Sequence, residues 1–291
     1  MRFHQAVAFL ETDQLLELGK ACDETGYAGM YLCDHIFFPK ELGSRYPYSP
    51  HEDGSPIWSP ETDWPDIWCV VSAMAAVTTK LNFTSGVYIA PARDVFTVAK
   101  LVSTAAYLSD NRVHLGVGVG WCEEEFDATG QDFHNRGRRL DDMIPALREL
   151  WKDGWSEHHG PHYDFGPLQM NPTPTAPIPI YGGGHSEPAL RRAARLCDGW
   201  LAAGAYTPDD AREYLGRMRG YLKEAGRDGD PFAIYLTLAA MPDVDLYKQF
   251  EDEGVTDMVC APWMLAGGVD STLEAKLAAT EEFATTVITK M

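Results

Sequence analysis

Short runs of β-branched and aromatic residues alternate along the chain with longer runs whose apolar residues recur at helical spacing. The short runs predict eight strands, at residues 3–9, 29–33, 81–89, 113–119, 178–181, 199–202, 232–238 and 258–261. The longer runs predict a helix after each strand, at residues 13–25, 66–79, 95–108, 138–151, 187–196, 208–225, 246–253 and 271–289. Eight such units predict a single-domain α/β protein, a (β/α)8 TIM barrel over residues 1–291. A doubly wound sheet in two domains is the alternative, but no long linker or change of composition divides the chain.

Two regions are too long to be simple connections of such a barrel. Residues 36–65 follow the second predicted strand and contain six prolines and several aromatic residues, among them Tyr46, Tyr48, Trp58 and Trp64. An insertion at that point lies over the C-terminal face of a barrel, where active sites form, so we expect a lid. Its rings either line a pocket for an apolar ligand or seal the mouth. The second insertion, residues 152–177, lies between the fourth predicted helix and the fifth strand and is rich in Gly, Pro and His.

Charge and composition narrow the classes of partner. With 24 basic against 43 acidic side chains, the formal net charge is -19, which disfavours nucleic acid as a partner. The N-terminal residues lack the apolar length of a signal peptide, and the longest apolar stretch, residues 67–77, is too short for a bilayer. Six cysteines without Cys-x-x-Cys spacing indicate reduced thiols. We therefore expect a cytoplasmic protein that binds neither membrane nor nucleic acid.

Three successive glycines, Gly182, Gly183 and Gly184, lie between the fifth predicted strand and the helix after it. Glycines leave backbone N–H groups uncovered, and Ser186 stands where a residue would cap the following helix, whose N-terminus attracts anions. This combination favours a phosphate site. No Lys-Ser/Thr follows the turn and the glycine spacing is not that of a dinucleotide fingerprint, so an ordinary strand-to-helix connection is the alternative.

Asp34 and His35 end the second predicted strand, at the expected C-terminal face. Histidine exchanges protons near neutral pH, and a neighbouring carboxylate can fix its tautomer. We therefore expect His35 to act on a proton and Asp34 to orient it. The alternative is a loop pair that only hydrogen-bonds the backbone.

Glycines also interrupt the third and fourth predicted strands. Gly86 in the third strand suggests a bulge. In the fourth strand Gly116, Gly118 and Gly120 occupy every second position, so one face carries no side chains. That face either leaves room for a flat ligand inside the barrel or allows close contact with a helix.

Three other polar clusters are expected to have mainly structural roles. The Glu-Glu-Glu run at residues 123–125 favours the first turn of a short helix, and a role for one of these carboxylates in the pocket is the alternative. His158, His159 and His162 have no carboxylate at ligand spacing, so we expect no metal site. The arginines of the helix after the glycines, Arg191, Arg192 and Arg195, are expected on its solvent face, away from the phosphate.

Taken together, several motifs resemble the luciferase-like monooxygenase superfamily, and within it the oxidoreductases that use the deazaflavin coenzyme F420. They are Cys-Asp-His at 33–35, Thr-Ser-Gly-Val-Tyr-Ile-Ala-Pro-Ala-Arg at 84–93, the glycine-rich segment 108–121, Arg-Gly-Arg-Arg-Leu-Asp-Asp-Met-Ile at 136–144, and the segment that follows the three glycines. The resemblance covers nearly the whole chain. It implies a (β/α)8 barrel with a deazaflavin or flavin ring across its C-terminal face.

The resemblance also implies roles for individual residues. A non-prolyl cis peptide would join Gly86 and Val87 and press a bulge against the ring. The coenzyme phosphate would lie at Gly182 to Ser186. The residues expected around the coenzyme are Gly86, Val87, Gly118, Gly120, Trp121, Glu124, Gly182, Gly183, Gly184, His185 and Ser186, with His35 and Asp34 as catalytic residues. Some relatives carry Glu where this chain has Trp121, and Glu124 is only a loose substitute for that carboxylate.

The leading hypothesis is hydride transfer between F420 and a small organic substrate, with His35 exchanging the accompanying proton. The second is an FMN-dependent monooxygenase that uses reduced flavin and oxygen. In either case a separate flavin or F420 reductase system would supply the electrons, and homodimers are common in the family. A coenzyme-binding protein without catalysis is a third hypothesis, and a metal hydrolase a remote fourth. The net charge of -19 is awkward for F420, because the glutamyl tail of that coenzyme is anionic.

Overall fold

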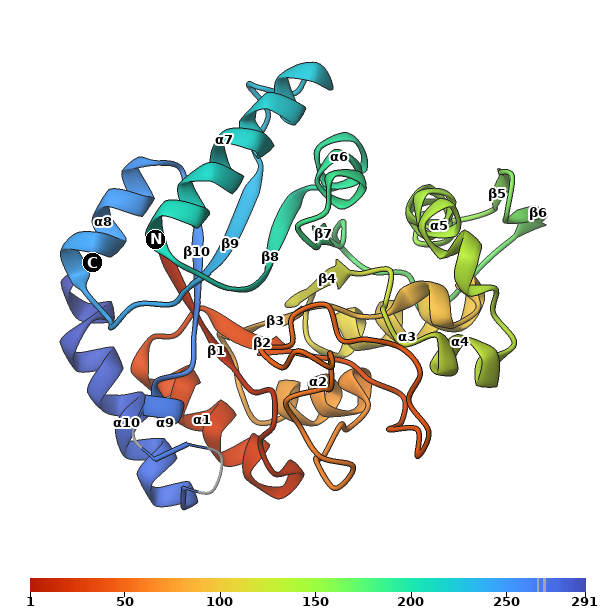
Figure 1. The fold of residues 1–291 in the computed structure, drawn as a ribbon. Helices are drawn as coiled ribbons and strands as arrows, with labels where there is room; N and C mark the ends of the chain where they lie inside the picture. Colours follow the sequence, from red (N-terminus) through yellow and green to blue (C-terminus); the bar gives the residue numbers. More distant parts are fainter. Residues whose placement is uncertain (266, 269–270) are drawn as a thin grey trace.

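A closed barrel of eight parallel strands forms the centre of the molecule (Figure 1). The computed structural model describes residues 1–265, 267–268 and 271–291. Around the barrel the strands follow the order β1, β10, β9, β8, β7, β4, β3, β2. Their bounds are β1 Arg2–Ala6, β2 Gly29–Leu32, β3 Asn82–Ser85, β4 Val113–Val117, β7 Ile180–Gly183, β8 Gly199–Tyr206, β9 Ala233–Leu238 and β10 Asp257–Cys260. The predicted TIM barrel is confirmed.

Helices surround the barrel, and five of the described α-helices begin at a residue whose side chain caps them. The bounds are α1 Leu15–Thr25, α2 Ile67–Ala75, α3 Val95–Leu108, α4 Glu123–Thr129, α5 Arg136–Leu150, α6 Glu187–Leu196, α7 Pro208–Glu224, α8 Val244–Asp252, α9 Pro262–Leu265 and α10 Leu273–Thr286. Asp66, Asp94, Thr207, Asp243 and Thr272 each accept a hydrogen bond from a backbone N–H of the first turn. These caps satisfy donors that a helix leaves free, and they fix where each helix starts.

Two strand ends differ from the prediction in a way that shapes the mouth of the barrel. β3 ends at Ser85, the Gly86–Val87 peptide that follows is cis, and the chain then pairs at Tyr88 with Val117. β7 continues to Gly183, so two of the three glycines expected in a turn belong to a strand. Only Gly184, with φ 116°, has a conformation that a turn residue needs.

The core has two layers. Apolar residues of the outer strand faces and the inner helix faces form the larger layer. Inside the barrel, Tyr31, Tyr181, Leu201, Tyr235 and Val259 pack together. The barrel is therefore filled by side chains, as in other (β/α)8 barrels.

The two insertions are built differently. Residues 33–66 contain no helix or strand. The second insertion forms an antiparallel hairpin, β5 Ser156–His159 and β6 Asp164–Leu168, which projects beside α5 (Figure 1). Asp142 of α5 holds it by accepting hydrogen bonds from His158 Nε2 at 2.9 Å and His162 N at 2.7 Å. The sequence predicts this insertion but not its hairpin, because the strands are short and polar.

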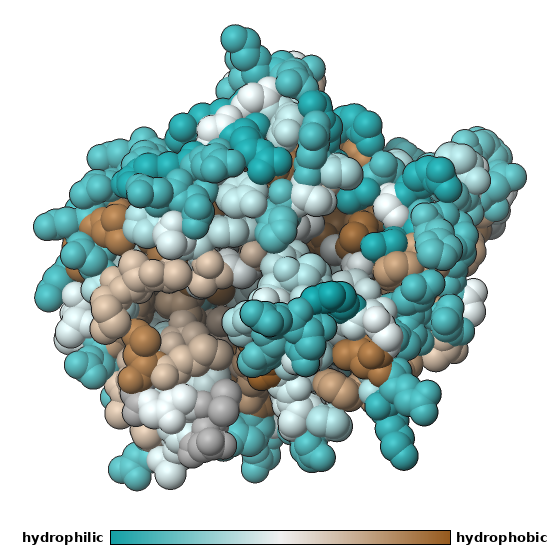
Figure 2. All heavy atoms as spheres, in the orientation of Figure 1, coloured by the Kyte–Doolittle hydropathy of each residue, from teal (hydrophilic) through white to brown (hydrophobic). Residues whose placement is uncertain are grey.

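The outer surface is mainly polar. Figure 2 shows hydrophilic residues over the helices and paler, less polar residues around a hollow left of centre. In the described part of the chain, no helix combines the length and the apolar character that crossing a membrane requires.

Candidate functional site at the C-terminal mouth of the barrel

His35 lies at the mouth of the barrel, three residues after the end of β2. Its Nδ1 is 3.2 Å from Oε1 of Glu125, a fully buried residue of α4. The same oxygen accepts a hydrogen bond from the backbone N–H of Ile36 at 2.6 Å. Because a carboxylate oxygen accepts this hydrogen bond, the proton of the contact lies on Nδ1, and Nε2 is the ring nitrogen that Glu125 leaves free. The ring can then take up or release a proton through Nε2.

Asp34 does not orient His35, which corrects the expected pair. Its two oxygens accept hydrogen bonds from Arg93 at 2.8 and 2.9 Å, and Oδ2 also accepts from the backbone N–H of Ile89 at 2.9 Å. Successive residues point in different directions, so the carboxylate turns toward the segment after β3. Asp34 therefore fixes that segment, and Glu125 takes the orienting role.

Glu124, a residue expected near the coenzyme, is hydrogen-bonded to the first insertion. Its Oε1 accepts hydrogen bonds from the backbone N–H groups of Gly43 at 2.6 Å and Ser44 at 3.1 Å. Burial acts to raise the pKa of Glu124, but these hydrogen bonds and one from the Ser44 side chain outweigh it and lower the pKa to about 2. This carboxylate ties the first insertion to α4.

Glu125 is the residue that the sequence interpretation missed, although the sequence carries a signal for it. Cys122 and Phe126 are four residues apart, and both are buried. Glu125, three residues after Cys122, shares that inward face of the helix. The acidic run therefore combines one buried carboxylate with two partly exposed ones.

Aromatic rings surround His35. The ring centroids of Trp64, Trp58 and Trp121 lie 4.8, 5.1 and 5.7 Å from that of His35, and Tyr46 packs on both Trp58 and Trp121. They leave the His35 side chain only 10% exposed. Three of the rings come from the first insertion, so this insertion covers His35 as a lid would.

The Gly86–Val87 peptide is cis, as the resemblance implies. The Val87 side chain fills the space that two glycines leave. A Cβ atom at Gly118 would lie 2.3 Å from Val87 Cγ2, and one at Gly183 would lie 2.2 Å from Val87 Cγ1. The missing side chain at Gly118, just after β4, thus makes room for the bulge that carries Val87. Gly120 packs against Phe126 of α4, where a Cβ would lie 3.0 Å from Cε2.

The start of α6 offers backbone N–H groups that have no hydrogen-bond partner among the described residues. They belong to the residues after the three glycines. The N–H of Gly184 donates to Leu201 O at 3.2 Å. Those of His185, Ser186 and Glu187 have no hydrogen-bond partner among the described residues, and Ser186 occupies the cap position without a side-chain cap bond. This is the arrangement that binds anions at helix N-termini.

His185 stands beside these donors in a small aromatic group. Its ring lies 5.1 Å from Tyr48 of the first insertion and 5.9 Å from Tyr214 of α7, with Nδ1 3.4 Å from Tyr206 Oη. Burial lowers the pKa of His185 below its ordinary value. The insertion thus contacts both His35 and the start of α6.

The three arginines of α6 lie away from its N-terminus. Two of them are on the solvent face of the helix, and the third is not. Arg191 and Arg195 are exposed, whereas Arg192 is buried and donates to Asp141 of α5 at 2.5 Å. The solvent-face prediction is therefore wrong for Arg192, which links α6 to α5.

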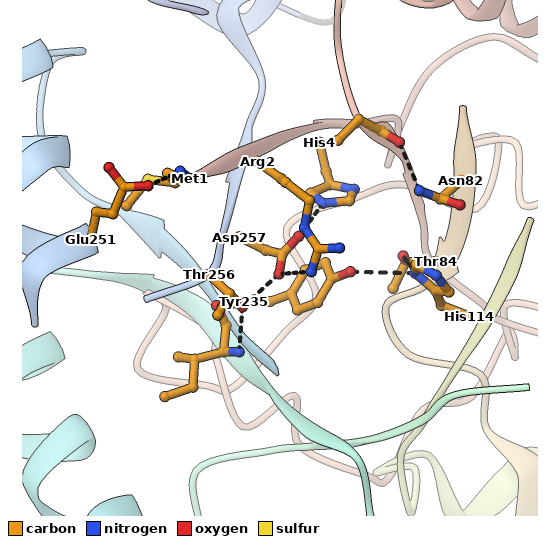
Figure 3. A network of polar contacts seen from close by, with 12 residues as sticks. Met1, Arg2, His4, Asn82, Thr84, His114, Tyr235, Glu251, Thr256 and Asp257 are labelled. Atoms are coloured by element: carbon orange, nitrogen blue, oxygen red, sulfur yellow. Dashed lines mark hydrogen bonds and ion pairs between the residues drawn. The ribbon is translucent and has the colours of Figure 1, made fainter. Parts of the chain in front are cut away.

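The opposite end of the barrel is closed by a buried polar network (Figure 3). His4 Nε2 lies 2.6 Å from Asp257 Oδ1, and Arg2 donates to Oδ2 at 2.8 Å. Burial acts to raise the pKa of Asp257, but the hydrogen bonds from His4 and Arg2 lower it below its ordinary value. Nearby, burial lowers the pKa of His114 to about 4. The N-terminal end of a (β/α)8 barrel contributes to stability, so this network has a structural role.

Among the described residues, no group of three or more His, Cys, Asp or Glu side chains is arranged to hold a metal ion. Of the three histidines in the second insertion, His158 is paired with Asp142 and His159 with Asp164 at 2.6 Å. These contacts are structural.

The barrel, the cis-peptide bulge and the buried His35–Glu125 pair define a TIM-barrel protein with a candidate active site at its C-terminal mouth. The model of the luciferase-like monooxygenase family matches residues 4–245, and the chain belongs to this family. An uncharacterized protein of Mycobacterium tuberculosis is 37% identical over 294 residues, covering 100% of both chains.

Two solved structures share the fold. The coenzyme F420-dependent tetrahydromethanopterin reductase of Methanopyrus kandleri has a TM-score of 0.76 and 16% identity, covering 99% of each chain. The monooxygenase RslO1 of Streptomyces bottropensis has a TM-score of 0.74 and 16% identity, covering 100% of this chain and 99% of its own. Members of the family are oxidoreductases, and the solved structures that share the fold include an F420-dependent reductase and a monooxygenase.

Proposed function

We propose that this protein is an oxidoreductase that transfers a hydride between coenzyme F420 and a small organic substrate, with His35 exchanging the proton. The observation that carries the proposal is the hydrogen bond of His35 to the buried Glu125 at the mouth of the barrel. Reduction of a carbonyl, or oxidation of an alcohol, moves one hydride and one proton, so a positioned proton-exchanging group is what the chemistry requires.

The residues at the mouth fit a coenzyme of this type. The free N–H groups of His185, Ser186 and Glu187 would hold its phosphate. Val87, raised between Gly118 and Gly183, would support the ring. When bound, a deazaflavin supplies hydride chemistry, and the protein supplies orientation and proton transfer.

His35 has the properties of a general acid and base. Glu125 holds Nδ1, so Nε2 accepts a proton in the neutral ring and donates one in the imidazolium. The surrounding tryptophans exclude water from this exchange. Glu125 is a positioning residue, because it acts through His35.

Separate fluorescence titrations with F420 and FMN test the choice of coenzyme. We expect saturable binding of F420, and weaker binding in a variant with Ser186→Asp, because the new carboxylate repels a phosphate at this helix terminus. Arg195→Gln, which makes the charge more negative by the same one unit on the exposed face of the same helix, is the matched control.

The catalytic assignment is tested with His35→Ala. We expect turnover of reduced F420 with simple ketones and aldehydes to fall by about 10²- to 10⁴-fold, while coenzyme binding changes little. Unchanged turnover would remove His35 from the mechanism.

The alternative is an FMN-dependent monooxygenase, and RslO1, which is named a monooxygenase, shares the fold. Tight FMN binding without any response to F420 would favour it over hydride transfer to or from F420. In both cases we expect a separate reductase to regenerate the reduced coenzyme.

A further inference from the structure

A narrow hollow opens beside His35, and its walls are apolar. They include Phe37, Phe38, Leu42, Trp58 and Trp121. No Lys, Arg, Asp or Glu is among the described residues that line it. Cys122 also lines it, and burial raises the pKa of this thiol to about 12, so it stays uncharged.

Two basic residues near the mouth, Arg93 and Arg45, already have partners. Arg93 is paired with both oxygens of Asp34. In the first insertion Lys40 and Arg45 are exposed, and Arg45 donates to the carbonyl of Glu52. None of these cations lines the hollow, so a phosphate or carboxylate on a substrate would be desolvated there without a Lys or Arg partner, which is costly.

An ammonium group is the rival occupant, because tryptophan faces attract cations and Glu125 Oε2 is buried without a hydrogen-bond partner among the described residues. The rings, however, pack edge to face on one another. Trp58 meets Trp64 at 67° and Tyr46 at 80°. In both pairs the edge of one ring meets the face of the other, so these rings do not form a box of open faces around a cation.

We infer that the substrate is an uncharged ketone or aldehyde, or the matching alcohol, whose reacting carbon carries an aryl or similarly flat apolar group. The inference rests on the proposed function. The apolar group contacts Trp58, Trp121 and Phe38, and the oxygen faces His35. The hollow is narrow and most of its walls belong to the insertion, so the substrate binds by displacing rings of the insertion and meets the apolar surface that they present.

The reduction is balanced as follows. A hydride with its electron pair, supplied by reduced F420, forms a C–H bond at the carbonyl carbon. The C=O π pair moves to the oxygen, which takes the proton of imidazolium His35 through Nε2. The substrate gains two electrons and becomes the alcohol, the coenzyme loses two, and His35 becomes neutral.

Binding is measured by saturation-transfer NMR titration of the F420-loaded protein with acetophenone, 4-acetylbenzoate and 4-acetyl-N,N,N-trimethylanilinium. These ketones share one ring and differ in charge. We expect acetophenone to bind at least about tenfold more tightly than either ion, because each ion would be desolvated without a partner. Equal or tighter binding of an ion, or no acetophenone binding up to its solubility limit, would overturn the inference.

Variants locate the binding surface. Trp58→Ala should weaken acetophenone binding about five- to tenfold, and Trp58→Phe should restore most of it, because a flat ring returns. Trp155→Ala is the matched control, since Trp155 lies on the hairpin and is 76% exposed. If Trp58→Ala and Trp155→Ala bind acetophenone equally well, the hollow is not the binding surface.

The same samples separate this inference from the proposed function. Oxidation of reduced F420 on addition of acetophenone is followed by absorbance. Preferential binding of acetophenone without any oxidation of the coenzyme would refute the proposed function and leave the inference on the substrate surface standing. Oxidation of the coenzyme combined with equally tight binding of the charged ketones would refute the inference on the substrate surface and leave the proposed function standing.

Discussion

The Val87 side chain lies between two glycines, and this arrangement makes a quantitative prediction for Gly183→Ala. The added Cβ would lie 2.2 Å from Val87 Cγ1, whereas carbon atoms in contact are about 3.5 to 4.0 Å apart. Val87 cannot rotate away easily, because a β-branched side chain has few χ1 options and its Cγ2 already faces Gly118.

The magnitude follows from the contacts that remain when Val87 is shortened. Forcing a methyl group into a packed site costs about 1 to 3 kcal/mol of unfolding free energy. With Val87→Ala both Cγ atoms are gone, and the Cβ of residue 87 would lie 3.5 Å from the new Cβ, which is ordinary contact. We therefore expect Gly183→Ala to cost less than about 1 kcal/mol in the Val87→Ala background.

Urea unfolding of the four proteins of this double-mutant cycle is the assay. The coupling free energy between positions 87 and 183 should exceed about 1 kcal/mol. Gly166→Ala on β6 is the control, because a Cβ there has no heavy atom within 4 Å. If Gly183→Ala costs the same with Val87 and with Ala at position 87, Val87 is not what this glycine accommodates, and the reasoning fails.

Three further predictions concern stability. The pKa of about 4 for His114 lies below the unfolded value near 6.5, so its contribution is complete above about pH 6.5 and is lost as the pH falls toward 4. Urea titrations should show about 2 kcal/mol of this loss between pH 7 and pH 5, and His114→Gln should abolish it. Arg93→Met leaves the buried Asp34 carboxylate unpaired and should cost about 3 to 5 kcal/mol in urea, of which Asp34→Asn in the same chain recovers part; an intact stability would show that the pair is dispensable. Asp142→Ala removes the acceptors for His158 and His162 and should speed chymotrypsin cleavage within residues 152–177 with little change in Tm, whereas cleavage elsewhere would contradict this anchoring role.

The barrel could be predicted from the sequence because its signals are local. The alternation of strand and helix patterns depends on residues that are neighbours in the chain, and side-chain caps such as Asp94 and Thr207 reinforce it. The position of His35 at the mouth follows from the same pattern, since the residues after a barrel strand lie at its C-terminal face.

Partners within the site could not be predicted, because they are far apart in the chain. Glu125 reaches His35 across 90 positions, and Arg93 reaches Asp34 across 59. Adjacency of Asp34 and His35 suggested a pair, but neighbouring residues at a strand end point apart. Helical spacing places Glu125 on an inward face, and only the fold shows which residue that face meets.

The three glycines show how one motif can combine separate physical requirements. A Cβ at Gly182 would lie 2.9 Å from Ala193 Cβ, so this glycine permits close contact of β7 with α6. Gly183 makes room for Val87, and Gly184 adopts a positive φ where the chain turns. None of the three requirements is phosphate binding.

The proposed phosphate site therefore depends on the residues that follow, His185, Ser186 and Glu187, whose N–H groups have no hydrogen-bond partner in the described chain. Substitutions at Gly182 or Gly183 would perturb packing whether or not a coenzyme binds, so only changes at position 186 and its neighbours can test the phosphate itself.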